Sequence, residues 1–399
     1  MKQNTTYKQT ELGLIPEDWE VKKFNKFSKF YSGGTPLTSK SEYYGGEIPF
    51  IKSGEIYYDR TEQFLTQEGL NNSSAKLVYR GDLLYALYGA NSGEVAISQL
   101  EGAINQAILC IQQNKDEAET IYLYNYLKLE KSNIINKFLQ GGQGNLSADI
   151  IKNLQIPLPP LPEQQKIAEI LSTWDKAIQE VGLLIKKLEV RNKALAFSLL
   201  RGRLVNKNSR KISLSKFLTF TPREIEKPTE NYLALGIRSH GKGIFHKPDS
   251  DPKAIAMDKL YEVKENDFIV NITFAWEHAV AIISKEDEGG LVSHRFPTYV
   301  IDQKRVSVEF FRHIILQPFF KQMLDNISPG GAGRNRVLSK KDLLKLEISV
   351  PSLEEQHSIA AILNTAHQEL KQYQEKLKAL QQQKKGLMQQ LLTGKIRTV

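Results

Sequence analysis

Two long stretches of the chain place apolar side chains at intervals that alternate between four and three residues. One stretch begins near residue 161 and the other near residue 353, and each continues for about nine turns of helix. This spacing predicts two helices that each carry one narrow apolar stripe. Each stripe could dock onto its own domain, but a narrow stripe of this length favours pairing of the two helices with each other.

The stripe positions define a heptad seam on each helix. In the first helix they are Ile167, Leu171, Trp174, Ile178, Val181, Ile185, Leu188, Asn192, Leu195 and Leu199, and in the second they are Ile359, Leu363, Ala366, Leu370, Tyr373, Leu377, Leu380, Lys384, Leu387 and Leu391. If the helices pair antiparallel about equivalent midpoints, Trp174 faces Lys384 and Asn192 faces Ala366.

Capping signals mark the ends of both predicted helices. Pro162 falls in the first turn of the first helix, and Ser352 with Glu355 forms a capping box before the second. Gly202 and Gly394 follow the last apolar positions and are typical of C-terminal caps.

The two helical stretches are also copies of each other. LPPLPEQQKIAEILSTWDKAI recurs 192 residues later as SVPSLEEQHSIAAILNTAHQEL, without a gap. Fainter similarity links residues 80–97 with 265–282, and GGQGNLS at 141–147 with GGAGRNRVLS at 330–339. A repeat of this length indicates that half of the chain was duplicated and then diverged.

Composition adds limits to this picture. A length of 399 residues favours two core-forming units, and no run of 18 apolar residues could span a membrane. Cys110 is the only cysteine, and the polar start of the chain lacks the apolar region of a signal peptide. We therefore expect a cytoplasmic protein without disulfides.

Charge favours a polyanionic partner but is unevenly distributed. The formal net charge is +9, whereas residues 1–162 hold 16 basic and 18 acidic side chains and residues 206–350 hold 23 and 18. The first half is therefore not basic overall, and neutralisation of phosphates there must be local or come from partner subunits.

Four motifs resemble the conserved regions of the specificity subunits of type I restriction-modification enzymes. They are IPLPPLPEQQKIAEIL (Ile156–Leu171), GLIPEDWEVKKF (Gly13–Phe24), SGGTP (Ser32–Pro36) and GGQGNLS (Gly141–Ser147). The second copy departs from this pattern, because SGGTP has no clear equivalent near Thr221 and Glu354 stands where a proline is common.

The resemblance implies an α+β fold: two mixed α/β target-recognition domains joined by two long helices in an antiparallel coiled coil, with a pseudo-two-fold internal repeat. Its domains would be residues 1–158 and 206–350, and its helical spacers residues 159–205 and 351–399. The implied function is non-catalytic: to recognise an asymmetric, bipartite sequence in double-stranded DNA. The implied partners are two modification subunits, which use S-adenosylmethionine to methylate adenine, and restriction subunits, which use ATP and magnesium for cleavage.

Catalytic motifs are missing from the sequence itself. Neither the adenine-binding motif of N6-adenine methyltransferases nor their glycine-rich cofactor loop occurs, and GIRSHGKG (Gly236–Gly243) lacks the Ser or Thr of a phosphate-binding loop. Asp249, Asp251 and Lys253 resemble a nuclease signature only superficially and fit a solvated turn better. Seven histidines and one cysteine show no paired ligand spacing, so we expect no metal site.

Polar side chains on loops rich in small residues are the candidates for reading bases, although each also fits ordinary turn or surface chemistry. In the first half they are Ser32, Gly33, Gly34, Thr35, Lys52, Ser53, Asn91, Ser92, Gln143 and Asn145, and in the second half they are Arg238, Ser239, His240, Lys242, Arg334, Asn335 and Arg336. Lys52 and Arg238 both follow an apolar run, and we expect both near the DNA.

Two other classes of function stay open at this point. A DNA-binding regulator or scaffold would need no methylase, and co-purification with a modification subunit would argue against it. A self-sufficient methyltransferase would transfer a labelled methyl group to DNA without a partner.

Overall fold

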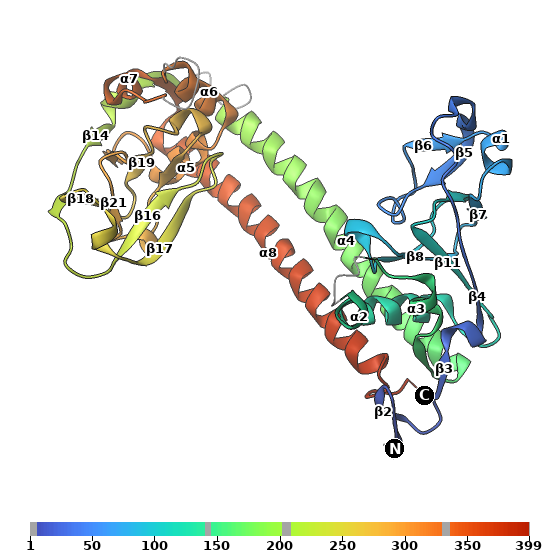
Figure 1. Ribbon diagram of the computed structural model, residues 1–399. Coiled ribbons are helices and arrows are strands. Elements are labelled where there is room, and N and C mark those ends of the chain that lie inside the picture. The colour runs from blue at the N-terminus through green and yellow to red at the C-terminus, as the bar shows by residue number, and fades with distance from the viewer. Residues whose placement is uncertain (1–5, 140–144, 202–208, 329–335, 399) are drawn as a thin grey trace. The chain divides into compact units, whose positions relative to one another are not determined.

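The computed structural model describes residues 6–139, 145–201, 209–328 and 336–398 (Figure 1). The chain divides into two compact units, the first formed by Met1–Gly182 with Glu375–Val399 and the second by Leu183–Gln374. The division passes through both long helices, so each unit contains part of each. No helix within the described ranges is long and apolar enough to cross a membrane.

The first unit contains twelve described strands, three helices and parts of the two long helices. Its strands are β1 (Tyr7–Thr10), β2 (Gly13–Pro16), β3 (Glu20–Lys23), β4 (Ser28–Ser32), β5 (Tyr44–Ile51), β6 (Gln63–Leu65), β7 (Lys76–Val78), β8 (Leu83–Ala86), β9 (Val95–Ile97), β10 (Gly102–Ile104), β11 (Ile108–Gln113) and β12 (Gln155–Leu158). Its helices are α1 (Gln67–Asn71), α2 (Thr120–Leu139) and α3 (Ala148–Lys152), with the 3-10 turn η3 (Gly89–Asn91) between β8 and β9.

The second unit follows the same order of elements. Its strands are β13 (Arg210–Ser213), β14 (Leu218–Phe220), β15 (Glu224–Glu226), β16 (Tyr232–Ile237), β17 (Ile244–Ser250), β18 (Lys259–Glu262), β19 (Phe268–Val270), β20 (Val280–Ile282), β21 (Leu291–Val292), β22 (Thr298–Ile301) and β23 (Glu347–Val350). Its helices are α5 (Val308–Ile315), α6 (Pro318–Asn326) and α7 (Lys340–Lys345), with the turn η6 (Ala275–Glu277). The long helices are α4 (Leu161–Leu200) and α8 (Leu353–Leu391).

Besides two-stranded sheets, each unit contains two larger sheets of matching topology. The order β4-β11-β8-β9 in the first unit corresponds to β14-β22-β19-β20 in the second, and β6-β5-β10-β7 corresponds to β17-β16-β21-β18, to which β15 is added. In both, one strand pair is parallel: β5 with β10 and β16 with β21. The duplication inferred from the sequence is therefore present in the fold.

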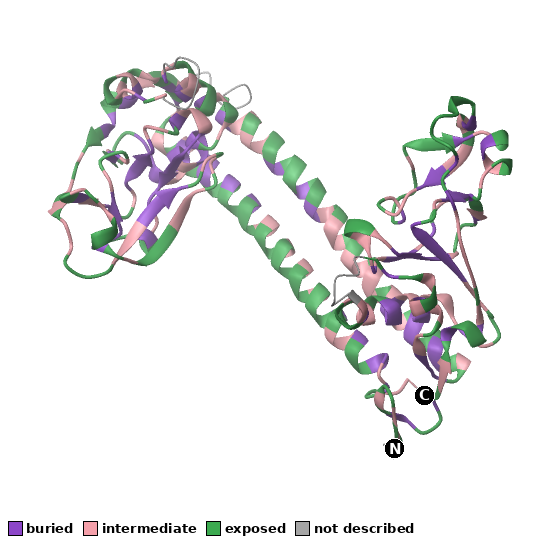
Figure 2. Ribbon diagram, viewed as in Figure 1, coloured by how far each residue is buried: buried purple, intermediate pink, exposed green. Residues whose placement is uncertain are grey.

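The strands β8 and β19, in the interior of the sheets β4-β11-β8-β9 and β14-β22-β19-β20, are buried on both faces (Figure 2). In the first unit Leu83 and Tyr85 of β8 point toward α2 and the long helices, whereas Leu84 and Ala86 pack toward the other four-stranded sheet. In the second unit Phe268 of β19 faces the helices, and Ile269 faces the five-stranded sheet. The two-residue period of a strand produces this division.

The paired helices are antiparallel, as the resemblance implied. In the second unit the amide nitrogen Nδ2 of Asn192 donates to the carbonyl oxygen of Ala366 at 2.8 Å. In the first unit the Lys384 ammonium contacts Asp175 Oδ1 at 2.5 Å, beside Trp174. Both heptad stripes are buried or partly buried, and Gly394 has the left-handed φ of +70° that a C-terminal cap requires.

A repeated glutamine anchors the start of each long helix to its unit. Gln164 Nε2 donates to the carbonyl oxygens of Pro159 and Glu117, and Gln356 Nε2 donates to those of Pro351 and Arg305. Both amide oxygens accept a backbone N–H at or next to the start of a domain helix. This shared geometry explains why the glutamine occurs in both copies of the motif.

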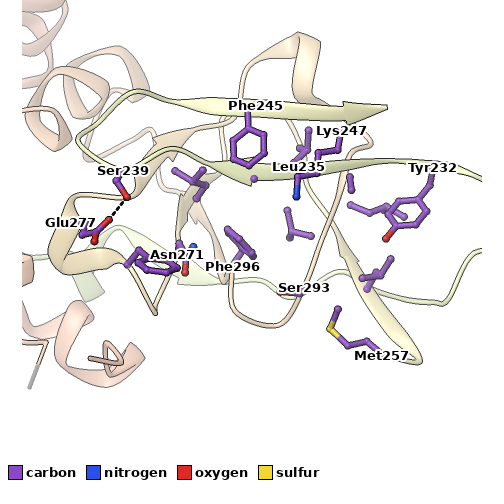
Figure 3. Close-up of a pocket in the computed structure, with 17 residues that line it drawn as sticks. Tyr232, Leu235, Ser239, Phe245, Lys247, Met257, Asn271, Glu277, Ser293 and Phe296 are labelled. Atoms are coloured by element: carbon purple, nitrogen blue, oxygen red, sulfur yellow. Dashed lines mark hydrogen bonds between the residues drawn. The ribbon is translucent and has the colours of Figure 1, made fainter. Parts of the chain in front are cut away.

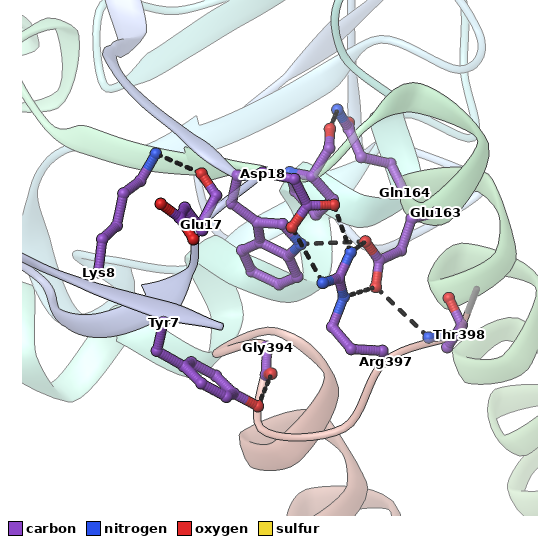
Figure 4. A network of polar contacts seen from close by, with 11 residues as sticks. Tyr7, Lys8, Glu17, Asp18, Glu163, Gln164, Gly394, Arg397 and Thr398 are labelled. Atoms are coloured by element: carbon purple, nitrogen blue, oxygen red, sulfur yellow. Dashed lines mark hydrogen bonds and ion pairs between the residues drawn. The ribbon is translucent and has the colours of Figure 1, made fainter. Parts of the chain in front are cut away.

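The neighbouring glutamate has a different role in the first copy (Figure 4). The Glu163 carboxylate is buried and accepts hydrogen bonds from Trp19 Nε1 at 3.0 Å and from Arg397 Nε and Nη2, each at 2.8 Å. Arg397 also contacts both carboxylate oxygens of Asp18, and Tyr7 donates to the carbonyl oxygen of Gly394. The first unit is thus closed by residues from both ends of the chain.

Candidate nucleic-acid interface

The two cations that the sequence analysis paired occupy the same topological position. Lys52 directly follows β5 and Arg238 directly follows β16, the strand of each unit that runs parallel to a neighbour. The Arg238 side chain is exposed, and its guanidinium lies 5.4 Å from the centre of the Phe245 ring. Each cation therefore begins the loop that leaves the same edge of its sheet.

A second loop in each unit, the one that contains η3 or η6, lies against this first loop. In the first unit a Cβ atom added to Gly54 would lie 3.4 Å from Asn91 Nδ2, so the predicted loops around Lys52 and Asn91 meet. In the second unit the Ser239 hydroxyl donates to Glu277 Oε2 at 2.6 Å, and the His240 N–H donates to the Glu277 carbonyl oxygen.

The two η loops have the same backbone course. The fainter sequence alignment pairs Gly93 with His278, and both have a left-handed φ, +82° and +68°. The N–H of Ala86 donates to the backbone carbonyl oxygen of Glu94, and the N–H of Asn271 donates to that of Ala279, at equivalent places. The polar side chains that these loops carry are nevertheless different.

The loop that ends each glycine-rich motif lies behind the η loop. The N–H of Leu146 donates to the carbonyl oxygen of Leu87, and Leu338 donates in the same way to Ile272. Ser147 and Ser339 then cap α3 and α7 by accepting a backbone N–H. Both motifs therefore have a capping role.

Of the predicted residues in these two motifs, some can be placed and some cannot. Asn145 is exposed, and Arg336 contacts Asp325 at 2.7 Å while its guanidinium lies 5.3 Å from the centre of the Trp276 ring. Gln143, Arg334 and Asn335 lie outside the described residues.

The SGGTP motif is mostly a packing motif. A Cβ atom added to Gly33 would lie 1.7 Å from the carbonyl oxygen of Ile104, and one added to Gly34 would lie 2.1 Å from Ser74 Oγ. Only glycine permits this close approach, so these two residues support the loop and offer no side chain to a ligand. Ser32 ends β4, and Thr35 is exposed and donates to Gln106 Oε1 at 2.7 Å.

Thr35 and Lys52 share a hollow with side chains that the sequence analysis missed. The hollow has a volume of about 330 Å³, and Gln63 and Asn105 also line it. Asn105 follows β10, and the parallel pairing of β10 with β5 brings it beside Lys52. No local pattern in the sequence indicates this pairing.

The remaining candidates lie in or beside the same loops. Ser53 and Ser92 are partly buried, and the Ser92 hydroxyl donates to the carbonyl oxygen of Leu87. His240 and Lys242 are exposed, and His240 has a left-handed φ of +64°. The loop of residues 238–243 is held from behind, because Gly241 N–H donates to the His278 carbonyl oxygen.

The partly exposed Glu94 carboxylate and its two partners hold the η3 loop in place. Glu94 contacts Tyr57 and Lys131 through short hydrogen bonds. Burial alone would raise the pKa of Glu94, but the hydrogen bonds from Lys131 and Tyr57 lower it below its ordinary value overall. The carboxylate therefore stays charged near neutral pH and keeps the loop in place.

The described part of the chain contains no group of three or more His, Cys, Asp or Glu side chains that could hold a metal ion. The loop clusters instead combine exposed cations, amides and hydroxyls at one sheet edge of each unit. Such side chains are suited to phosphates and to the polar edges of bases.

The model of a known protein family matches most of the chain. The type I restriction modification DNA specificity domain matches residues 16–189 and 224–382, which together make up more than half of the chain. The chain therefore belongs to this family and carries its domain twice.

Relatives of similar sequence carry names that agree with this family. The specificity subunit of the type I restriction enzyme MjaVIII of Methanocaldococcus jannaschii is 24% identical over 96% of this chain and 94% of its own length. The MjaIX specificity subunit of the same organism is 34% identical over 44% of this chain and 42% of its own length. These proteins are named as specificity subunits, so this chain is a non-catalytic DNA-specificity protein of a type I system.

A solved structure shares the fold. The crystal structure of the type I restriction-modification S subunit from M. genitalium has a TM-score of 0.59 and covers 98% of this chain and 99% of its own, at 15% identity. The architecture of two α/β domains and two long helices is thus confirmed.

Proposed function

We propose that each unit reads one half of a split, asymmetric sequence in double-stranded DNA. The observation that carries this proposal is the pair of equivalent loop clusters, which follow equivalent strands of the two units but carry different side chains. Equivalent frames suit two similar binding tasks, and different side chains suit two different half-sites.

The proposed contacts differ between the units. In the first unit Lys52, Asn91 and Asn105 offer one cation and two amides, and Thr35 offers a hydroxyl. In the second unit the exposed Arg238 suits the two acceptors of a guanine, and His240 and Lys242 would contact phosphates. The domains responsible are residues 1–158 and 206–350.

The long helices, within residues 159–205 and 351–399, are the proposed spacers and the docking elements for two modification subunits. Those subunits would bring S-adenosylmethionine and methylate adenine. Restriction subunits, with ATP and magnesium, would add cleavage. We place this complex in the cytoplasm, where its DNA substrate lies.

A domain exchange tests the proposal. The chain is co-expressed with the modification subunit of its own system, and methylated adenines are mapped across the host genome. Replacing residues 1–150 by the equivalent segment of another specificity subunit should change one half-site only. The retained half-site shows that the chimera is folded, and altered bases in both halves would contradict separate reading.

A further inference from the structure

The second unit contains a pocket of about 470 Å³ beside Arg238, between β16 and η6 (Figure 3). Phe245, Phe274 and Phe296 are among its lining residues. A Cβ atom added to Gly236 would lie 2.3 Å from Phe245 Cζ, so the ring lies directly over the glycine. The pocket therefore offers flat apolar surfaces, which suit a planar ligand.

Asn271 offers a hydrogen-bond donor to this pocket. The residue is only 7% exposed and lines the pocket, and its Oδ1 accepts the N–H of Thr273 at 3.1 Å. That hydrogen bond fixes the orientation of the amide, so the Nδ2 group is the free end. Among the residues that the structure describes, no acceptor contacts Nδ2, and this nitrogen is not one of the enclosed polar atoms without a partner, so it is open to a ligand in the pocket.

Glu277 offers an acceptor at the same end of the pocket, as Figure 3 shows. Its Oε2 accepts the Ser239 hydroxyl at 2.6 Å, and its carbonyl oxygen accepts the His240 N–H at 2.7 Å. These contacts hold the residue in place. Within the described ranges Oε1 accepts no hydrogen bond, so one carboxylate oxygen remains for a ligand.

The first unit lacks this combination. The alignment that pairs the two η loops puts Ala86 in the place of Asn271 and Ser92 in the place of Glu277. The backbone hydrogen bonds at Ala86 and Asn271 are equivalent, so the frame is shared and only the side chains differ. The donor and acceptor are therefore specific to the second unit.

We propose that this pocket reads a nucleobase that presents an exocyclic amino group beside a ring-nitrogen acceptor. Glu277 Oε1 accepts from the amino group, and Asn271 Nδ2 donates to the ring nitrogen. Adenine has this pair of groups, and so does cytosine on its pairing edge, whereas the major-groove edges of guanine and thymine would face the carboxylate with an acceptor, O6 or O4. The inference rests on the proposed function, because it assigns one base of the second half-site.

The base can reach the pocket from two sources. A paired adenine presents N6 and N7 in the major groove, and an unstacked adenine or cytosine presents its pairing edge. Both use the same donor and acceptor of the protein, so the experiment includes an arm that separates them.

The test uses the full chain assembled with its modification subunits and the methylation map of the wild-type complex. Glu277→Ser and Asn271→Ala install the residues of the first unit. We expect both to lower the preference for one adenine or cytosine of the second half-site about tenfold or more, while the first half-site stays unchanged. Glu347→Gln, on the exposed edge of β23, is the matched acidic control and should change nothing.

Glu277→Gln guards against a folding defect, because glutamine keeps the size and the acceptor of the glutamate. Its amide can also donate, so we expect guanine or thymine to be admitted at the same position. Synthetic duplexes containing 7-deazaadenine then separate the sources: binding falls if N7 is read and is unchanged if the pairing edge is read.

The outcomes are distinct. If the wild-type complex methylates no bipartite site, the proposed function fails. If it does, and the Glu277 and Asn271 variants all retain the wild-type base preference, the pocket does not read a base and this inference is overturned.

Discussion

The contact between Arg397 and Glu163 permits a sharp test of how the first unit is closed. Arg397→Ala removes two of the hydrogen bonds to a carboxylate whose side chain is fully buried. Trp19 Nε1 and a longer contact from the Thr398 N–H would remain. An uncompensated buried charge costs about 3–5 kcal/mol. The second partner of Arg397, Asp18, has a half-exposed side chain and contributes little to that figure.

Hydrogen exchange read by mass spectrometry measures this loss locally. We expect amides at the start of α4 and in β3 to open about a hundredfold to a few thousandfold more often in Arg397→Ala, since each 1.4 kcal/mol is a factor of about ten. Amides of the second unit should keep their rates. Lys395→Ala, which removes an exposed cation two residues away, is the control.

A double variant separates the buried charge from simple loss of packing. In Arg397→Met with Glu163→Gln, no buried charge remains at the site, and the glutamine still accepts from Trp19. We expect most of the protection to return. The reasoning is refuted if Arg397→Ala costs less than about 1 kcal/mol, or if the neutral pair is as unstable as Arg397→Ala.

Three further predictions concern the seam, the histidines and a glycine. Burial is the largest influence on Lys384 and lowers its pKa, so the charged seam lysine opposes folding below that pKa and ceases to do so as pH rises toward 10.5. Lys384→Met should therefore raise the free energy of unfolding of the first unit by about 1 kcal/mol at pH 7 in a urea titration, and a clear loss would contradict this. All seven histidines lie in the second unit, and burial lowers the pKa of His278 and His313 below 6.5. Their neutral forms favour folding, so stability is complete above pH 6.5 and is lost as pH falls below it; exchange at pH 7.5 and 5.5, corrected for intrinsic rates, should show weakening of the second unit alone. Gly33→Ala should lower the free energy of unfolding by about 2–3 kcal/mol, because its Cβ would overlap the carbonyl oxygen of Ile104. Gly182→Ala, in open space on α4, should raise it by about 0.5–1 kcal/mol, and thermal unfolding of both variants measures the difference.

The sequence was most informative where structure depends on a period or on a repeat. The heptad spacing predicted both long helices and their pairing with each other, because a narrow stripe of this length suits a partner helix. Their antiparallel direction was implied by the resemblance to the specificity subunits. The alignment of two apolar runs assigned Lys52 and Arg238 to equivalent positions of the two halves. In the structure each residue directly follows the equivalent strand of its unit. These inferences needed no knowledge of which strands pair.

The parts that the sequence missed depend on pairings between distant segments. Asn105 joins Lys52 only because β10 runs parallel to β5, and nothing local predicts that neighbour. The proposed role of Glu277 could have been inferred from the sequence, since the alignment of residues 80–97 with 265–282 pairs it with the candidate Ser92. It was overlooked because an acidic side chain does not suit DNA phosphates, although it suits a base amino group.

The closure of the first unit by the end of the chain has a consequence for synthesis on the ribosome. Residues 375–399 supply Met388, Leu391 and Leu392 to its core as well as Arg397, and they are made after residues 183–374. The second unit is one continuous segment, residues 183–374, and all its parts have emerged earlier. We therefore expect the unit that is translated first to be the one that finishes folding last, so that an interrupted chain exposes the apolar surface of its first half.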